Sequence, residues 1–208
     1  MGRLRLRPAQ PDDLAALCDV YFSAFSDNLV QQMVFPATSP EARNFWHSGL
    51  STDMQDPNSR LIVVVEEAVG PQGRATEQII AFAKWMRPMQ LGETYAPGPA
   101  LEDWPRDGDP EFGAQFFGSL AMQHEEIMKK RPHWYLECIA TSKEHQGRGA
   151  GGMLVRWGVE RADRDGVESY LDSTAEGRGL YVKHGFREIK RLWWLGGSYS
   201  QCFMIRDK

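Results

Sequence analysis

A cluster of glycines is the part of the sequence with the clearest chemical use. Gln146-Gly147-Arg148-Gly149-Ala150-Gly151-Gly152 follows a short run of aromatic and aliphatic residues and precedes a segment whose apolar residues have helical spacing. Glycine lacks a Cβ, so the backbone there can approach a ligand closely, and the first N–H groups of a helix are unpaired donors at its positive end. The pattern predicts an anion site where a strand meets a helix, suited to a phosphate or pyrophosphate.

Two other glycine-rich motifs share part of this pattern. Gly147-x-Gly149-x-x-Gly152 satisfies the dinucleotide fingerprint, and Asp172 lies where a ribose-binding acid would be sought. In that fold the first glycine ends the strand, whereas positions 141–146 intervene here and too little chain follows for the remaining parallel strands. A P-loop is excluded because no Gly-Lys-Ser/Thr follows. A glycine-rich turn without a ligand remains as the structural alternative.

The pattern and its surroundings resemble a known family. Gln-x-x-Gly-x-Gly, here Gln146, Gly149 and Gly151, resembles the acyl-coenzyme A loop of the GNAT superfamily of N-acyltransferases. Downstream, positions 169–174 read as the next strand, and the segment from Tyr181 to Phe186 is similar to that family's ending of tyrosine, three residues and Gly-Phe. The resemblance covers His133 to Phe186 and is most like the version common in fungal members. It departs at Thr174, where many members carry asparagine.

The resemblance implies a fold and an activity. The expected fold is α/β (α+β), with a mixed, mostly antiparallel central sheet flanked by helices and the acyl-CoA loop between a central strand and the following helix. The expected function is an N-acetyltransferase that moves an acetyl group from acetyl-CoA directly to an amine of a small molecule or a peptide. A hydroxyl acceptor is one alternative, and a non-catalytic coenzyme A-binding or scaffold protein is the other. Intact Gly149, Gly151 and Tyr181 favour the enzyme.

The resemblance also assigns residues to the cofactor. Arg148 is a candidate charge partner for a phosphate. The expected contacts come from main-chain groups of the central strand, from the glycine-rich loop and from the next strand: Ile139, Thr141, Gln146, Gly147, Arg148, Gly149, Ala150, Gly151, Gly152 and Thr174.

Two catalytic roles remain, those of a proton donor and of a base. In the resembled family a tyrosine often protonates the leaving thiolate, and Tyr181 matches it; a phenol with a pKa near 10 stays protonated at neutral pH. Packing of a helix is the alternative for Tyr181. For the base we favour Glu137, a carboxylate in an otherwise apolar strand, where desolvation would raise its pKa and where strand parity matches Ile139. Asp172 and His133 are the rivals.

Composition limits the class of protein. The 208 residues, 42% hydrophobic and 25% charged with a net charge of -4, suit one domain over positions 1–208 with an insertion loop at about 87–110. We expect an intracellular, cytoplasmic protein with no nucleic-acid partner and no membrane span, because there is no basic excess and no long apolar run. Cysteines are few and scattered and no Cys/His cluster has metal spacing, so no metal is expected.

Periodicity predicts the remaining elements. Strands are expected at 3–7, 60–66 and 79–85, the last two joined by a turn at Gly70-Pro71-Gln72-Gly73, and a final hairpin at 189–195 and 199–205. Helices are expected at 11–25 and 111–130, and short packing helices within 26–40. Acceptor specificity should reside in positions 26–55 and 87–110. The second of these is a Pro- and Gly-rich loop, either an acidic lid over an amine pocket or, more commonly, a solvated surface loop.

Overall fold

A seven-stranded sheet forms the centre of the computed structural model, which describes residues 2–69, 75–90, 93, 95 and 98–208. The expected turn at 70–73 lies outside the described residues. The strands are β1 (Arg3–Pro8), β2 (Ser59–Val69), β3 (Ala75–Met86), β4 (His133–Thr141), β5 (Glu168–Thr174), β6 (Arg187–Trp194) and β7 (Tyr199–Arg206). Their order is β1-β2-β3-β4-β5-β7-β6.

The sheet is mixed and mostly antiparallel. Among the strands described, β4 and β5 form the only parallel pair, and every other neighbouring pair is antiparallel. Both faces of the central strands are buried, which explains why β2 reads as a continuous β-branched run: Val63 packs into one core and Val64 into the other. The predicted fold class is confirmed.

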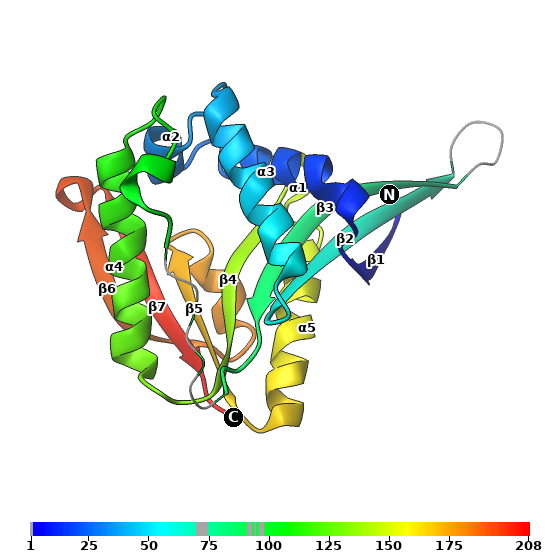
Figure 1. The fold of residues 1–208 in the computed structure, drawn as a ribbon. Helices are drawn as coiled ribbons and strands as arrows, with labels where there is room; N and C mark the ends of the chain where they lie inside the picture. Colours follow the sequence, from blue (N-terminus) through cyan, green and yellow to red (C-terminus); the bar gives the residue numbers. More distant parts are fainter. Residues whose placement is uncertain (1, 70–74, 91–92, 94, 96–97) are drawn as a thin grey trace.

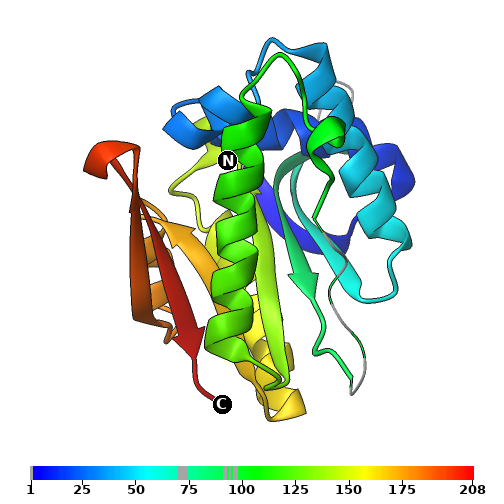
Figure 2. The same cartoon turned by 60° about the vertical axis from the view of Figure 1, so that its left-hand side comes forward.

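Helices cover the two faces unequally (Figure 1). One face carries α1 (Leu14–Ala24), α2 (Leu29–Val34), α3 (Pro40–Gln55) and α4 (Pro110–Met128), and the other carries α5 (Ala150–Asp165) and the short α6 (Arg178–Val182). Figure 2 shows α4 lying along the half of the sheet that holds β4, β5 and β7, with α1 and α3 over the other half.

Local signals fix where these helices begin. Ser39 and Asp109 cap α3 and α4 by accepting the backbone N–H groups of Ala42 and Phe112 at 3.0 and 2.9 Å. A proline occupies the first turn of each. The sequence pattern did not predict α3, because its apolar residues are few and irregularly spaced. No helix among the described residues is long and apolar enough to cross a bilayer.

Candidate active site

The two parallel strands separate halfway along their length. The register pairs of β4 with β5 run from His133 opposite Glu168 to Leu136 opposite Leu171. Beyond Leu136, β4 continues to Thr141 paired only with β3, and β5 continues to Thr174 paired only with β7. Backbone groups of β4 on the β5 side are therefore left without a strand partner, which creates an opening in the middle of the sheet.

The direction of the backbone groups shows which residues face this opening. The N–H of Ser142 donates to the Ile80 carbonyl of β3 at 2.9 Å. Backbone groups alternate in direction along a strand, so those of Ala140 also face β3, whereas those of Ile139 and Thr141 face the opening. The Gln146 side chain donates from Nε2 to the Thr141 carbonyl at 3.1 Å. Ile139, Thr141 and Gln146, which the sequence assigned to the cofactor, thus lie together at the open end of β4.

The glycine-rich loop joins this open end to α5. Gly147 and Gly149 have φ angles of 74° and 91°, in the left-handed region that favours glycine, and a Cβ built on either would meet nothing within 4 Å. No side chain caps the start of α5, so its first N–H groups keep free donor capacity. The loop therefore offers open space and unpaired donors at a positive helix end, which fits the phosphates of an acyl-coenzyme A.

Arg148 is engaged within the protein. Its guanidinium forms a two-pronged ion pair with Glu66 of β2, with N–O distances of 2.9 and 2.5 Å. The Arg148 guanidinium and the Gly2 N–H, which also donates to that carboxylate, lower the pKa of Glu66 to about 2. A phosphate could bind Arg148 only in competition with the carboxylate of Glu66. This ion pair weakens the expectation that Arg148 binds a phosphate of the cofactor.

The remaining residues that the sequence assigned to the cofactor differ in which of their groups are available to a ligand. The side chain of Ala150 is buried in the core under α5, which leaves only its backbone to face a ligand. Gly151 and Gly152 lie in the first turn of α5. Thr174 uses its hydroxyl to accept the Gly177 N–H at 3.3 Å, a turn contact that precedes α6.

Tyr181 lies on α6, in the core on the α5 face of the sheet. The residue is 5% exposed and its ring packs edge-on against Phe186. Burial, reinforced by the charges of Asp172 and Cys138, raises the pKa of Tyr181, so the phenol stays protonated. Within the described residues its hydroxyl has no hydrogen-bond partner in the protein. Tyr181 thus has a buried proton to donate and lies close to Asp172 and Cys138.

A β-bulge in β4 separates the face of Glu137 from that of Ile139. The register shifts so that Lys84 of β3 pairs with Cys138 while the next residue, Trp85, pairs with Leu136. The extra residue places Glu137 on the helical face of α1 to α4, with Tyr135 and Cys138, whereas Ile139 packs against the α5 face. The expected shared parity of Glu137 with Ile139 is therefore wrong.

Glu137 is also neither lone nor desolvated. Its carboxylate pairs with Lys84 Nζ at 2.8 Å and its side chain is 38% exposed. The same Nζ lies 2.7 Å from Asp53 of α3. Burial alone would lower the pKa of Lys84, but the charges of Glu137 and Asp53 outweigh it and the pKa is raised. The expected apolar environment of Glu137 is contradicted, and its role as a base stays a prediction without that support.

Asp172, and not Glu137, is a desolvated carboxylate with a raised pKa. It is the first residue of β5 beyond the last pair with β4, so it borders the opening. Its Oδ1 accepts the Tyr135 hydroxyl at 3.2 Å and its Oδ2 accepts Gln201 Nε2 at 2.8 Å. Burial raises the pKa of Asp172 to about 6, although both hydrogen bonds oppose the shift. A carboxylate of this kind can accept a proton near neutral pH.

His133 lies away from the opening. It starts β4, at the paired end, and its Nε2 shares a hydrogen bond of 2.6 Å with Nε2 of His124 on α4. Burial lowers the pKa of His133, and it lowers that of His124 to about 3. Glu137 is four positions further along β4 than His133, roughly 13 Å at the usual rise, so His133 is a poor candidate for the base.

Two acidic residues in the described part of the long loop before α4 have structural roles. Trp104 is 5% exposed and stacks on Phe35 and Phe45. Asp107 accepts the Ser39 hydroxyl at 2.8 Å, and Asp109 caps α4. The acidic residues that the structure describes at these two positions therefore fix the loop to α3 and α4.

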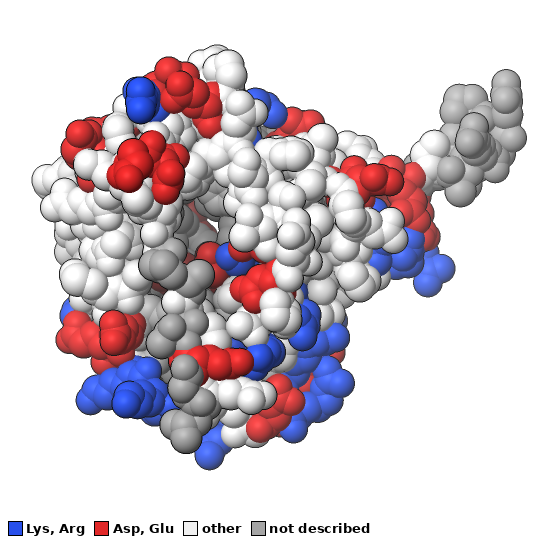
Figure 3. Space-filling model, in the orientation of Figure 1, with Lys and Arg blue, Asp and Glu red and all other residues white. Residues whose placement is uncertain are grey.

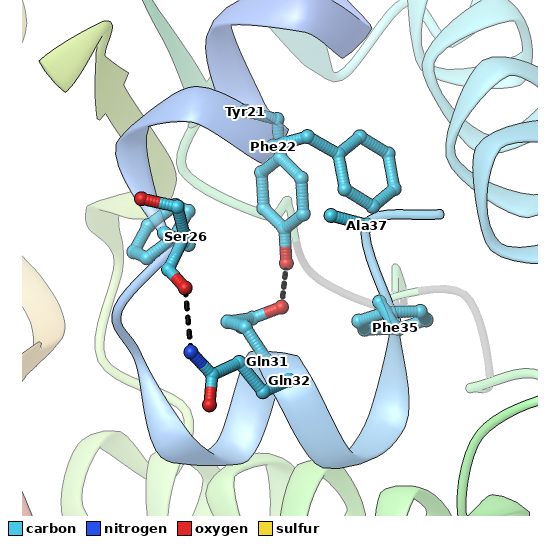
Figure 4. A pocket seen from close by; sticks show the side chains of 8 residues that line it. Tyr21, Phe22, Ser26, Gln31, Gln32, Phe35 and Ala37 are labelled. Carbon is cyan, nitrogen blue, oxygen red and sulfur yellow. Dashed lines mark hydrogen bonds between the residues drawn. The ribbon is translucent and has the colours of Figure 1, made fainter. Parts of the chain in front are cut away.

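The face opposite α5 is hollowed. Figure 3 shows a hollow between α4 and α3 with acidic and basic side chains at its floor. A small separate pocket lies where α1 connects to α2 and is lined by Tyr21, Ser26, Gln31, Gln32 and Phe35. In Figure 4 the Tyr21 hydroxyl points at the Gln31 amide, and Gln32 donates to the Ser26 carbonyl at 2.6 Å. The start of the expected acceptor segment is thus held by one hydrogen bond from α1 and one within the segment.

Metal chemistry has no candidate site here: within the described ranges, no three His, Cys, Asp or Glu side chains are grouped so as to hold an ion. Sequence reasoning missed Tyr135 and Gln201 as partners of Asp172. A signal existed for Gln201, a glutamine in the middle of the apolar run of β7, where a buried amide needs a partner. None existed for the bulge at Glu137.

Comparison with known proteins agrees with this geometry. A family model described as the acetyltransferase (GNAT) family matches residues 31–186. A solved structure titled histone acetyltransferase HPA2 and related acetyltransferase, from Corynebacterium glutamicum, is similar with a TM-score of 0.61 at 19% identity, covering 100% of this chain and 97% of that one.

Two further structures share the fold. A ribosomal-protein-alanine N-acetyltransferase from Brucella melitensis has a TM-score of 0.56 at 17% identity, with coverage of 98% and 99%. A NatC complex bound to Gag peptide and CoA has a TM-score of 0.54 at 13% identity, with coverage of 99% of each chain. At these identities the likeness establishes the fold.

Proposed function

The chain belongs to the acetyltransferase (GNAT) family, and from that premise we propose that it is an N-acetyltransferase that moves an acetyl group from acetyl-CoA directly to an amine. Membership supports acetyl transfer in general; the amine acceptor and the residue roles are our proposal. The acceptor is an amine of a small molecule or a peptide, selected by the segments 26–55 and 87–110.

One observation supports this proposal: the opening between β4 and β5 is bordered by the glycine-rich loop, by an edge of β4 that no strand pairs within the described residues, and by Asp172, with Tyr181 nearby. The glycine-rich loop from Gln146 to Gly152 holds the diphosphate through backbone N–H groups. The backbone of Ile139 and Thr141 pairs with the extended arm of the coenzyme. This directs the thioester to the level of Asp172 and Tyr181.

The proton transfers use Asp172 and Tyr181. Asp172 takes a proton from the ammonium, and the neutral amine attacks the thioester carbonyl carbon. A backbone N–H of β4 stabilises the oxyanion. When the carbon–sulfur bond breaks, Tyr181 gives its proton to the departing thiolate, and the proton released by nitrogen restores the tyrosine through solvent. The products are the N-acetyl compound and coenzyme A.

Asp172 replaces Glu137 as the proposed base. Glu137 is held by Lys84 at 2.8 Å, an ion pair that must be broken or weakened before it could take a proton. Asp172 carries a pKa raised by burial to about 6, close to the operating pH of a base at neutrality. Glu137 then remains part of an ion-pair cluster with Lys84 and Asp53.

Direct transfer of the acetyl group, without an acyl-enzyme intermediate, agrees with the protonated thiol of Cys138. Cys138 lies on the bulge, next to the opening, and is the obvious candidate for an acyl-enzyme intermediate. Burial, with the charge of Glu137, raises the pKa of Cys138, so the thiol stays protonated and is a poor nucleophile. An enzyme that used Cys138 as its nucleophile would need a lowered pKa of that thiol.

An acceptor screen tests the proposal. Acetyl-CoA is supplied with panels of small amines and of peptides with free α-amino or lysine groups, and free thiol release is followed. We expect amine-dependent release, with N-acetyl product by mass spectrometry and normal release in Cys138→Ala. Tight binding of coenzyme A without release in any panel would favour the non-catalytic alternative.

A further inference from the structure

A chain of side-chain hydrogen bonds crosses the sheet from the segment between α1 and α2 to Asp172. Asn28 Nδ2 donates to the Tyr199 hydroxyl at 3.4 Å, and that hydroxyl donates to Gln201 Oε1 at 3.2 Å. Gln201 Nε2 then donates to Asp172 Oδ2 at 2.8 Å. Asn28 also caps α2, because its Oδ1 accepts the Gln31 N–H at 3.1 Å.

The hydrogen bonds of this series all donate in one direction, from Asn28 toward Asp172. The single proton of the Tyr199 hydroxyl goes to Gln201 Oε1, which turns the amide nitrogen of Gln201 toward Asp172. The Asp172 carboxylate has no proton to give in its ionised form, so it is the final acceptor. A glutamate or a leucine at position 201 could not serve both neighbours in this way.

Packing alone does not explain why a glutamine is buried at position 201. It is 5% exposed in β7, where its neighbours Cys202 and Phe203 are fully buried. A buried amide is destabilising unless both its ends are hydrogen-bonded, and an apolar side chain would fill the space without that requirement. Gln201 satisfies both ends, and one of its two partners is the group that we assign as the base.

We propose that Gln201 is a positioning residue that holds the Asp172 carboxylate at the opening between β4 and β5 and links it, through Tyr199 and Asn28, to the acceptor segment. This rests on the proposed function, in which Asp172 takes the proton of the amine. The Tyr135 hydroxyl holds the other carboxylate oxygen at 3.2 Å, so the carboxylate is fixed from β4 and from β7.

Several other titratable groups lie close enough to Asp172 for their charges to interact with it. Each element packed against it contributes at least one: Tyr135, Glu137 and Cys138 from β4, Tyr199 from β7 and Tyr181 from α6, besides Tyr170 on β5 itself. Glu137 raises the pKa of Asp172, whereas Gln201 and Tyr135 lower it. Loss of the Gln201 donor should therefore raise the pKa of Asp172 further.

The test measures the carboxyl directly and through catalysis. Protein labelled with ¹³C at the aspartate carboxyls is titrated by NMR, with Asp172→Asn to assign the signal, and the pH profile of kcat/KM is recorded for the same proteins. In Gln201→Leu we expect the pKa of Asp172 to rise by about one unit, since a hydrogen bond to a charged group has about this strength. The acidic limb of kcat/KM should move to higher pH by the same amount.

Two other variants complete the experiment. Tyr199→Phe removes only the hydroxyl that orients the Gln201 amide, so it should move both readouts in the same direction by a smaller amount even if Gln201→Leu does not fold. Ser200→Ala is the matched control, because Ser200 bonds Arg191 and takes no part in the chain. It should leave both readouts unchanged.

Two results would overturn the proposal. One is an unchanged pKa of Asp172 in both Gln201→Leu and Tyr199→Phe. The other is a shifted pKa of Asp172 together with an unchanged acidic limb of kcat/KM, since Gln201 would then act on a group that is not the base. A wild-type protein that transfers no acetyl group would count against the proposed function instead, and the NMR titration would still decide whether Gln201 holds Asp172.

Discussion

Leu136 of β4 lies opposite Leu171 of β5, and within the described residues no later residue pairs the two strands. The next residue on each strand is a carboxylate, Glu137 or Asp172. The two carboxylates border the same opening but have different environments, because Glu137 pairs with Lys84 while Asp172 accepts only neutral donors. This difference assigns the proposed base.

Replacement of each carboxylate by its amide should separate the two candidates. Asp172→Asn removes the proton acceptor while keeping its shape, and we expect kcat/KM to fall on the order of a hundredfold or more. Glu137→Gln removes one of two anions at Lys84 and should cost less than about tenfold. Steady-state kinetics with a single amine measure both. A larger loss in Glu137→Gln than in Asp172→Asn would restore Glu137 as the base.

Asp172 should also reduce stability at neutral pH. Its folded pKa of about 6 exceeds its ordinary value of 3.8, so the folded state binds the proton more tightly than the unfolded state. Below about pH 3 both states hold the proton and the residue has no effect; as pH rises toward 6 the unfolded state ionises first and stability falls. The free energy of unfolding of Asp172→Asn minus that of the wild type should thus grow by about 3 kcal/mol from pH 3 to 7.

Urea unfolding at several pH values measures this difference. Glu160→Gln, an exposed substitution on α5, is the control and should show no such growth. A constant difference for Asp172→Asn across this range would mean that the carboxylate is not desolvated.

The sequence predicted the parts of the site that depend on short motifs. The glycine-rich loop, the strand before it and the tyrosine of α6 could be located because backbone conformation and residue spacing determine them. The β-bulge could not be predicted: it inserts one residue into a run that already reads as an apolar strand, and it turns Ile139 to the face opposite Glu137. The environment of Asp172 depends on Gln201, which is 29 residues away.

Tyr181→Phe should lower kcat and leave coenzyme A affinity nearly unchanged. The hydroxyl is the proposed proton donor, and its loss should reduce kcat on the order of a hundredfold. Tyr170→Phe is a control for the loss of a buried phenol hydroxyl, since that tyrosine is fully buried and its hydroxyl has no hydrogen-bond partner among the described residues. A kcat within about threefold of the wild type for Tyr181→Phe would make Tyr181 a packing residue or place thiolate release outside the rate-limiting step.

The buried histidine pair should make the fold sensitive to acid. Burial lowers the pKa of His124 to about 3, so the folded state keeps His124 neutral while the unfolded state binds a proton below about pH 6.5. Stability is then lost as pH falls, by about 1.4 kcal/mol per pH unit from this residue. His124→Phe keeps the stacking position on Tyr170 and should have a shallower pH dependence, whereas His47→Gln, on the surface of α3, should not. Equal slopes in all three proteins would contradict the assignment.

The central claim is that the loop from Gln146 to Gly152 binds acyl-coenzyme A through its backbone. Gly149 and Gly166 stand at opposite ends of α5, both with positive φ angles, of 91° and 66°, and both with nothing within 4 Å of a built Cβ. Replacing either with leucine should therefore cost a similar amount of stability, about 1 to 2 kcal/mol. The decisive measurement is calorimetric titration of acetyl-CoA into the wild type, Gly149→Leu and Gly166→Leu. We predict that binding is lost in Gly149→Leu and retained in Gly166→Leu; equal affinity in all three proteins would contradict the account.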